Sequence, residues 1–219
     1  MKQKILIIGD SLASHRDDDD YLLNERWPSL LENKSSFSLI NLSKSFSTTK
    51  VLKTLKRKII KIKPSHVLIQ LGIVDCVPRT FHKIETQILY RLPKSVRLFL
   101  IRTIKKIRTQ SFSRSYVKPN EFKNNIKHFC ADIDCKVIFI KILPASRTLI
   151  SKNKNAQSAI VNYNKIIDEI SSEISNFTFV EVNSDIVNEI TLDDGYHLNK
   201  EGHQYLSKLI LPKLKQVDI

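Results

Sequence analysis

Three side chains that together could perform nucleophilic catalysis stand near opposite ends of the chain. Ser11 follows an apolar run at residues 5–8 and a Gly-Asp pair, whereas Asp194 and His197 lie three residues apart near the C-terminus. A serine becomes a nucleophile when an imidazole takes its proton and a carboxylate orients that imidazole. The three-residue spacing lets the Asp194 carboxylate meet the far ring nitrogen of His197 while the near nitrogen faces Ser11. These residues therefore predict acyl-transfer chemistry.

The glycines of the chain also point to this chemistry. There are four in 219 residues, and all of them lie in or beside segments that carry Ser, Asp or His: Gly9, Gly72, Gly195 and Gly202. Glycine tolerates a positive φ and a close approach of two backbones. Glycines that are so few and so placed predict one site built from three distant segments.

Alternating apolar and amphipathic segments indicate the elements that position these residues. Continuous apolar runs predict buried parallel strands, and the amphipathic segments between them predict helices on both faces of a sheet. The predicted strands are residues 4–9, 37–42, 66–72, 136–142 and 177–182. The predicted helices are residues 21–32, 49–62, 120–131, 156–172 and 200–214, the last with Asn199 as its N-cap. Five such β–α units form a doubly wound sheet, with ligands beyond the carboxyl ends of its strands.

The segments around Ser11 and His197 resemble the first and last blocks of the SGNH (GDSL-type) hydrolase superfamily. The first is a strand followed by Gly-Asp-Ser, and the last is Asp-Gly-Tyr-His-Leu-Asn-Lys-Glu-Gly-His at residues 194–203, before a final helix. The resemblance implies a single domain over residues 1–219 with a flavodoxin-like α/β/α sandwich and a five-stranded parallel sheet. It also implies a Ser11–His197–Asp194 triad, esterase or related acyl-transfer chemistry, and no metal or organic cofactor.

The two middle blocks depart from the family pattern at the oxyanion hole. Phe46 stands where the second block has a glycine, and Val74 stands where the third block has an asparagine. The backbone amides of Ser11 and Phe46 would then hold the oxyanion, provided that Phe46 takes a φ that a side chain tolerates. Val74 offers no side-chain donor, and losing one such donor typically costs about 10²–10³ in rate.

Three explanations of the missing asparagine remain open. Arg79, or the amide of Asp75 or Cys76, could supply the donor. The substrate could bring its own polarisation, or the acyl group could be transferred instead of hydrolysed. Activity could also be lost, although the retained triad favours an active enzyme. Asp75 and Arg79 are further candidates for substrate contacts, Arg79 for an anionic group.

The positive charge of the chain is concentrated in one segment. Net charge is +14, and residues 51–115 carry sixteen Lys or Arg against two acids, whereas the rest of the chain is balanced. Such a segment attracts an anionic partner. About residues 78–117 form an insert after the third strand, in which apolar and basic residues interleave as in one or two amphipathic helices. Three roles are open for this insert: a lid, contact with an anionic membrane surface, and a nucleic-acid surface. The last is disfavoured because no groove-reading or stacking motif is present.

Other segments predict less about function. The apolar run at residues 5–8 is shorter than the roughly 7–15 residues of a signal peptide, so we expect a cytoplasmic protein, peripheral at a membrane if the insert binds one. Three cysteines predict reduced, partly buried thiols. The acidic run at residues 17–20 is expected to be a solvated loop, and His203 is expected on the surface of the last helix.

The expected substrate is an O-acyl ester, for example an O-acetyl group on a sugar. The resemblance implies a role with a bacterial glycan or its precursor. Two alternatives remain. An acyltransferase would pass the acyl group from Ser11 to a thiol or sugar acceptor, and a site shielded from water would favour it. A non-catalytic protein would use the same cleft and basic face to hold a glycan or lipid.

Overall fold

A computed structural model of the protein describes residues 3–14, 23–34, 37–79, 81, 83–107 and 115–215. Within them, five strands form one parallel sheet in the order β2-β1-β3-β4-β5. The strands are β1 (Lys4–Gly9), β2 (Ser38–Asn41), β3 (His66–Gln70), β4 (Lys136–Ile140) and β5 (Phe177–Val180). This is the flavodoxin-like strand order, whose switch point lies between β1 and β3. The predicted fold class is confirmed.

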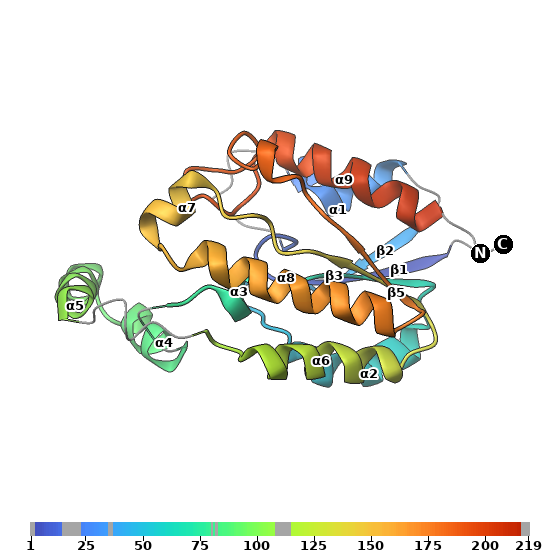
Figure 1. Ribbon diagram of the computed structural model, residues 1–219, viewed down its shortest axis with the longest axis horizontal. Coiled ribbons are helices and arrows are strands. Elements are labelled where there is room, and N and C mark those ends of the chain that lie inside the picture. The colour runs from blue at the N-terminus through green and yellow to red at the C-terminus, as the bar shows by residue number, and fades with distance from the viewer. Residues whose placement is uncertain are drawn as a thin grey trace.

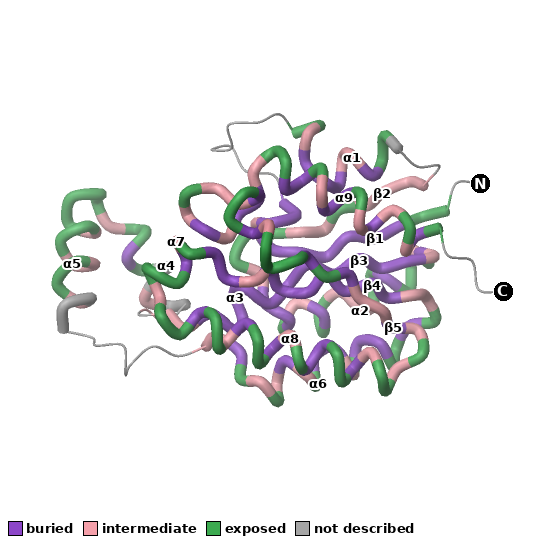
Figure 2. Tube along the Cα trace, turned by 45° about the horizontal axis from the view of Figure 1, so that its top comes forward, coloured by how far each residue is buried: buried purple, intermediate pink, exposed green. Residues whose placement is uncertain are grey.

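Helices cover both faces of the sheet and form a three-layer sandwich (Figure 1). One face carries α1 (Trp27–Lys34) and α9 (Lys200–Lys215). The other carries α2 (Val51–Ile62), α6 (Pro119–Ala131) and α8 (Ala156–Glu173). The central strands are therefore buried on both sides, as Figure 2 shows, and every residue of β3 is buried. Continuous rather than alternating apolar residues are what such strands require.

Most predicted helices agree with the structure within one or two residues, but the first does not. The prediction placed a helix over residues 21–32, whereas α1 begins at Trp27, after a short 3-10 turn (Leu23–Glu25). Pro28 explains the difference, because proline lacks an N–H and fits only the first turn of a helix. The predicted N-cap of α9 is confirmed, since Asn199 Oδ1 accepts a hydrogen bond from the Gly202 N–H at 2.9 Å.

The insert after β3 is helical, as predicted. A short helix, α3 (Ile73–Cys76), follows the strand before the insert, and the described helices of the insert are α4 (Lys83–Arg91) and α5 (Lys94–Ile107). Both lie beyond the carboxyl ends of the strands, and α5 lies farthest from the sheet (Figure 1). None of the helices in the described ranges has the length and apolar character needed to span a bilayer. The acidic run at residues 17–20 lies outside the described residues.

Candidate active site

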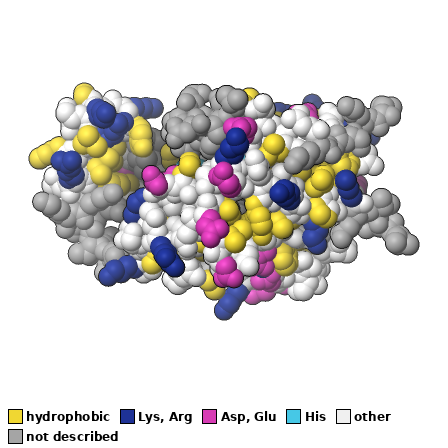
Figure 3. Space-filling view, turned by 90° about the horizontal axis from the view of Figure 1, so that it is seen from above, with side chains coloured by type: hydrophobic (Ala, Val, Ile, Leu, Met, Phe, Trp, Pro, Cys, Tyr) yellow, Lys and Arg dark blue, Asp and Glu magenta, His cyan; other side chains and the backbone are white. Residues whose placement is uncertain are grey.

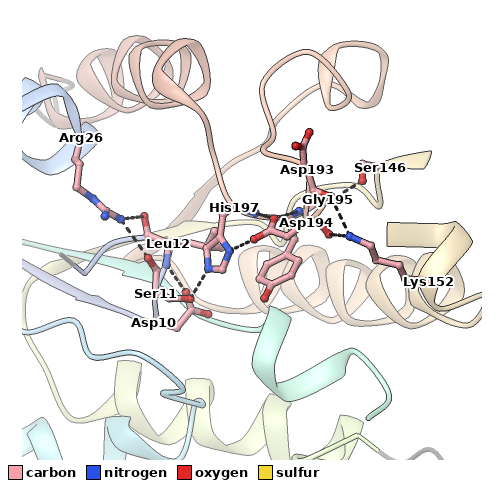
Figure 4. A network of polar contacts seen from close by, with 11 residues as sticks. Asp10, Ser11, Leu12, Arg26, Ser146, Lys152, Asp193, Asp194, Gly195 and His197 are labelled. Carbon is pink, nitrogen blue, oxygen red and sulfur yellow. Dashed lines mark hydrogen bonds and ion pairs between the residues drawn. The ribbon is translucent and has the colours of Figure 1, made fainter. Parts of the chain in front are cut away.

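The structure brings Ser11, His197 and Asp194 together at the carboxyl ends of the strands (Figure 4). Ser11 Oγ lies 2.8 Å from His197 Nε2. On the other side of the ring, His197 Nδ1 forms a hydrogen bond with Asp194 Oδ2. If the carboxylate accepts the proton on Nδ1, Nε2 is left unprotonated and can accept the Ser11 hydroxyl proton. The chain of contacts therefore has the connectivity of a nucleophile, a base and an orienting acid.

Backbone hydrogen bonds close the loop of residues 192–197, which places the Asp194 carboxylate against the His197 ring. The backbone of Leu192 donates to the His197 carbonyl at 2.8 Å, and Gly195 donates to the Leu192 carbonyl at 2.8 Å. Gly195 has a φ of 88°, a conformation that favours glycine. A Cβ there would also lie 2.5 Å from Ser146 Oγ, whose hydroxyl donates to the Gly195 carbonyl at 2.7 Å. Glycine at this position lets the loop close against Ser146.

The charge of Asp194 is stabilised by the same loop. Burial alone would raise the pKa of this carboxyl group, but the hydrogen bonds from the His197 side chain, the His197 N–H and the Tyr196 N–H outweigh it and bring the pKa well below its ordinary value. The two backbone bonds to Oδ1 measure 3.0 and 3.1 Å. Asp194 is therefore ionised at neutral pH, as an orienting carboxylate must be.

The turn that carries Ser11 is fixed by its own backbone and by one arginine. Asp10 accepts backbone bonds from Ala13 and Ser14 through its carbonyl and from Leu12 through its side chain. Arg26 Nη2 donates to the Ser11 carbonyl at 3.1 Å, and the arginine is buried. This contact was not predicted, because Arg26 lies in a segment that was expected to be helical, where a charged residue usually faces solvent.

Two further residues that sequence reasoning missed stand at the two ends of α7 (Arg147–Lys152), a helix that was not predicted. Ser146 caps it by accepting the Leu149 N–H at 3.1 Å, in addition to its contact with Gly195. Lys152 Nζ donates to the carbonyls of Asp193 and Asp194 at 2.9 and 3.4 Å (Figure 4). Neither Ser146 nor Lys152 belongs to a motif, so only the three-dimensional arrangement reveals their contacts.

Phe46, at the position where the second block of the family has glycine, has a backbone conformation that favours glycine. Its φ is 62°, and the turn is closed by the Ser47 N–H, which donates to the Lys44 carbonyl at 3.1 Å. A positive φ at this turn position normally selects glycine, and a side chain there costs about 1–2 kcal/mol. Within the described residues, neither the Phe46 N–H nor the Ser11 N–H has an acceptor in the protein. Both amides are available to an oxyanion.

The third block holds no replacement donor at Val74 or Cys76. Val74 is buried in α3, and the Cys76 N–H, one of the candidates for the missing donor, already donates to the Gly72 carbonyl at 2.8 Å. Asp75 is completely buried. Its Oδ1 accepts from the backbone N–H of Thr49 at 2.9 Å and from the Thr49 hydroxyl. Because this side chain is buried and bonded to Thr49, it is not placed for the substrate contact that was expected of Asp75. The side chain instead ties α3 to the segment that follows Phe46.

Asp10 makes stability depend on pH. Burial raises the pKa of Asp10 to about 7, and the nearby charge of Asp75 also raises it. The hydrogen bond from the Leu12 N–H and the charge of Arg79 lower the pKa, but they offset only part of the rise. A raised acid pKa means that the folded state holds a proton that the unfolded chain releases near pH 4. The contribution of Asp10 to the free energy of unfolding is therefore fully present below about pH 4 and is lost as the pH rises to about 7. The loss is on the order of a few kcal/mol.

We therefore expect Asp10→Asn to gain stability relative to the wild type over that pH range. The measurement is the free energy of unfolding in urea at pH values between about 4 and 8. Asp134→Asn, on the surface, controls for the substitution itself. If the free energies of unfolding of Asp10→Asn and wild type differ by the same amount at every pH in this range, the raised pKa of Asp10 is contradicted.

A cavity of about 480 Å³ is lined by Tyr196, the neighbour of His197, and by Lys152, which binds the Asp194 carbonyl. Phe46 and Tyr196 line the cavity, and the Tyr196 ring lies 4.2 Å, centroid to centroid, from that of His197. Leu89 of α4 and Ile101 of α5 line the wall that the insert supplies. Arg79 also lines the cavity, with its guanidinium 5.5 Å from the centroid of the Tyr116 ring. The site therefore combines aromatic surfaces with a cation.

Two remaining predictions outside the triad have different outcomes. His203 is buried, not on the helix surface as expected, and its Nδ1 accepts the Trp27 N–H at 3.3 Å. Burial lowers its pKa to about 3, so the ring is neutral and acts in packing. Cys76 and Cys130 are buried, Cys135 is half-buried, and all three thiols are free, as predicted.

Comparison with known proteins gives a family and a fold. A model of the GDSL-like lipase/acylhydrolase family matches residues 7–205. A psychrotrophic esterase EstA from Pseudoalteromonas sp. is 18% identical with a TM-score of 0.62, covering 98% of this chain and 97% of its own. A carbohydrate acetylesterase family member from Sinorhizobium meliloti is 14% identical with a TM-score of 0.64, covering 97% of both chains. An acetyl xylan esterase, Axe2, from Geobacillus stearothermophilus is 17% identical with a TM-score of 0.62, covering 99% and 96%. Among curated proteins there is no match.

Proposed function

The chain belongs to the GDSL-like lipase/acylhydrolase family, and we propose that Ser11, His197 and Asp194 are the residues with which it hydrolyses an O-acyl ester. Membership makes it an ester-hydrolysing serine hydrolase. The observation that carries the assignment of residues is the continuous chain of contacts from Ser11 Oγ through the His197 ring to the Asp194 carboxylate.

The reaction follows from these contacts. Ser11 Oγ attacks the carbonyl carbon of the ester while His197 Nε2 takes the hydroxyl proton. The imidazolium that forms is stabilised by Asp194, which stays ionised. Collapse of the tetrahedral intermediate breaks the ester bond, and His197 returns the proton to the leaving alkoxide. Water, deprotonated by the same imidazole, then attacks the acyl-Ser11 carbonyl carbon, and the imidazolium returns that proton to Ser11 Oγ as its bond to the acyl group breaks and the acid is released.

Backbone amides supply the oxyanion hole in this proposal. The N–H groups of Ser11 and Phe46 have no internal acceptor among the described residues, and the turn around Phe46 has a positive φ at the position where the family has glycine. Such preorganised donors stabilise the charge that develops on the carbonyl oxygen. Arg79 remains the candidate for a third cationic donor or for a contact with an anionic substituent of the substrate.

The cavity favours a substrate with a flat or apolar body and polar groups. Aromatic rings of Phe46, Tyr116 and Tyr196 line it together with the polar side chains of Arg79 and Asn153. Sugars are bound by such combinations of aromatic faces and hydrogen-bonding groups. Two of the similar solved structures are those of a carbohydrate acetylesterase family member and of an acetyl xylan esterase. We therefore propose a short O-acyl group, such as O-acetyl, on a glycan or its precursor.

Hydrolysis of p-nitrophenyl acetate, compared with release of acetate from O-acetylated sugars, tests this proposal. We expect both substrates to be hydrolysed, with water as the acceptor. Acyl transfer to an added sugar in preference to water would favour the acyltransferase alternative. Absence of turnover by the folded protein would favour a binding function.

Restoring the family's asparagine is expected to accelerate the reaction. Val74→Asn would add a side-chain donor at the aligned position, and one such donor is worth about 10²–10³ in rate where it is fully preorganised. Because Val74 is buried among apolar residues, we expect a smaller gain, about tenfold in kcat, with some loss of stability. Val74→Leu, of similar size but without a donor, is the matched control. A fall in kcat for Val74→Asn with the fold intact would show that position 74 does not face the oxyanion.

A further inference from the structure

The insert presents apolar side chains to solvent. Of the ten large apolar residues that are exposed among the described residues, five lie on α4 and α5: Ile88, Tyr90, Val96, Leu98 and Phe99. Tyr90 and Phe99 are 63% and 67% exposed. Figure 3 shows hydrophobic side chains gathered at the end of the molecule where α5 lies. Contiguous apolar patches on a surface mark sites of interaction.

The same surface is strongly basic. Residues 83–107 contain seven Lys or Arg and a single acid, Glu85. Lys94, Arg97 and Arg102 lie on α5 among the apolar residues, and lysine and arginine side chains appear beside the apolar ones in Figure 3. A partner for this surface must therefore combine negative charge with an apolar phase.

We propose that the α4–α5 surface, defined by the five exposed apolar residues and the basic residues among them, docks the protein on an anionic lipid bilayer. Amphipathic helices that bind membranes pair a basic polar face with aromatic and aliphatic residues, which enter the boundary between headgroups and acyl chains. The basic side chains are attracted by the negative surface potential of the headgroups. Nucleic acid would satisfy the charge but leave the apolar residues exposed to water.

The position of the surface relative to the cavity supports a lipid partner. Leu89 of α4 and Ile101 of α5 line the cavity, so the helices that would touch the bilayer also form one wall of the substrate site. Docking would bring that cavity to the interface where membrane-bound esters are presented. This step rests on the proposed esterase function. Substrates would then be acyl esters carried by an amphiphile, such as a lipid-linked glycan.

Vesicle flotation with phosphatidylcholine alone, or with about one-third phosphatidylglycerol, tests the docking surface. We expect the wild type to float with the anionic vesicles and to remain behind with the neutral ones. Leu98→Ser combined with Phe99→Ser is expected to reduce the partition coefficient at least about tenfold, because two inserted side chains are lost. Val161→Ser, an exposed apolar position on α8, is the matched control and should float like the wild type.

A pair of charge reversals separates location from net charge. Lys94→Glu with Arg102→Glu should reduce flotation, whereas Lys53→Glu with Lys208→Glu, the same change of net charge on α2 and α9, should reduce it far less. Equal flotation of both pairs, or no flotation of the wild type at low salt, would overturn the proposal. The proposal would also be overturned if the insert variants lost nucleic-acid binding or self-association but kept vesicle binding. Turnover of dissolved p-nitrophenyl acetate, measured on every variant, reports the esterase separately, so failure of docking and failure of the proposed function are distinguishable.

Discussion

Ser11→Ala is expected to lower kcat for ester hydrolysis by about 10⁵–10⁶-fold, the size of effect found when the nucleophile of a serine hydrolase is removed. The hydroxyl is the only group of Ser11 that contacts His197, and alanine leaves the backbone of the turn unchanged. Arg26 and Asp10 bind the main chain of this turn rather than the hydroxyl, so the fold should be unaffected. Steady-state turnover of p-nitrophenyl acetate measures the effect.

Ser172→Ala on the surface of α8 is the matched control, since it removes a hydroxyl far from His197 and should leave kcat unchanged. Unfolding in urea should give the same free energy for Ser11→Ala and wild type within about 1 kcal/mol. If Ser11→Ala keeps a tenth or more of the wild-type kcat, Ser11 is not the nucleophile.

Asp194→Asn is expected to lower kcat by about 10⁴-fold. The amide can still accept the backbone bonds from Tyr196 and His197 at Oδ1, but it offers an N–H where Oδ2 now accepts from Nδ1 of His197. The ring would turn to the tautomer whose protonated Nε2 cannot take the Ser11 proton. The pKa of Asp194, held low by these bonds, ensures an ionised carboxylate in the wild type.

The neighbouring Asp193 provides the control for this substitution. Asp193→Asn makes the same chemical change one residue away, where only the backbone carbonyl takes part in the contacts described, and we expect little effect on kcat. The double variant Ser11→Ala with Asp194→Asn should be no slower than Ser11→Ala alone, because the residues act as a unit. Additive losses would contradict a shared role.

The sequence predicted the sheet, the triad and the family because each rests on local patterns. Apolar runs located all five strands, and the blocks around Ser11 and His197 carried a resemblance that the family match over residues 7–205 confirms. The strand order then follows from the family's fold. Helix boundaries were less certain where a proline intervened, as at Pro28.

The supports of the site could not be predicted because they join residues that are far apart in sequence. Arg26 reaches the Ser11 carbonyl from the residue before α1, and Asp75 reaches Thr49 across 26 positions. Their burial decides their roles, and a single charged letter in a sequence does not reveal burial. For Phe46 the sequence and the structure each supply one part. Comparison with the family motif identified the missing glycine, and the structure shows that the phenylalanine has a positive φ.

Covalent labelling by a fluorophosphonate probe tests the central claim most directly. The probe reacts with a serine whose hydroxyl is activated by a base, and we expect one phosphonyl group per molecule, located by peptide mass spectrometry on Ser11. His197→Ala should abolish labelling while circular dichroism shows an intact fold. Labelling at another serine, or none on the folded wild-type protein, would contradict the assignment of Ser11, His197 and Asp194 as one catalytic unit.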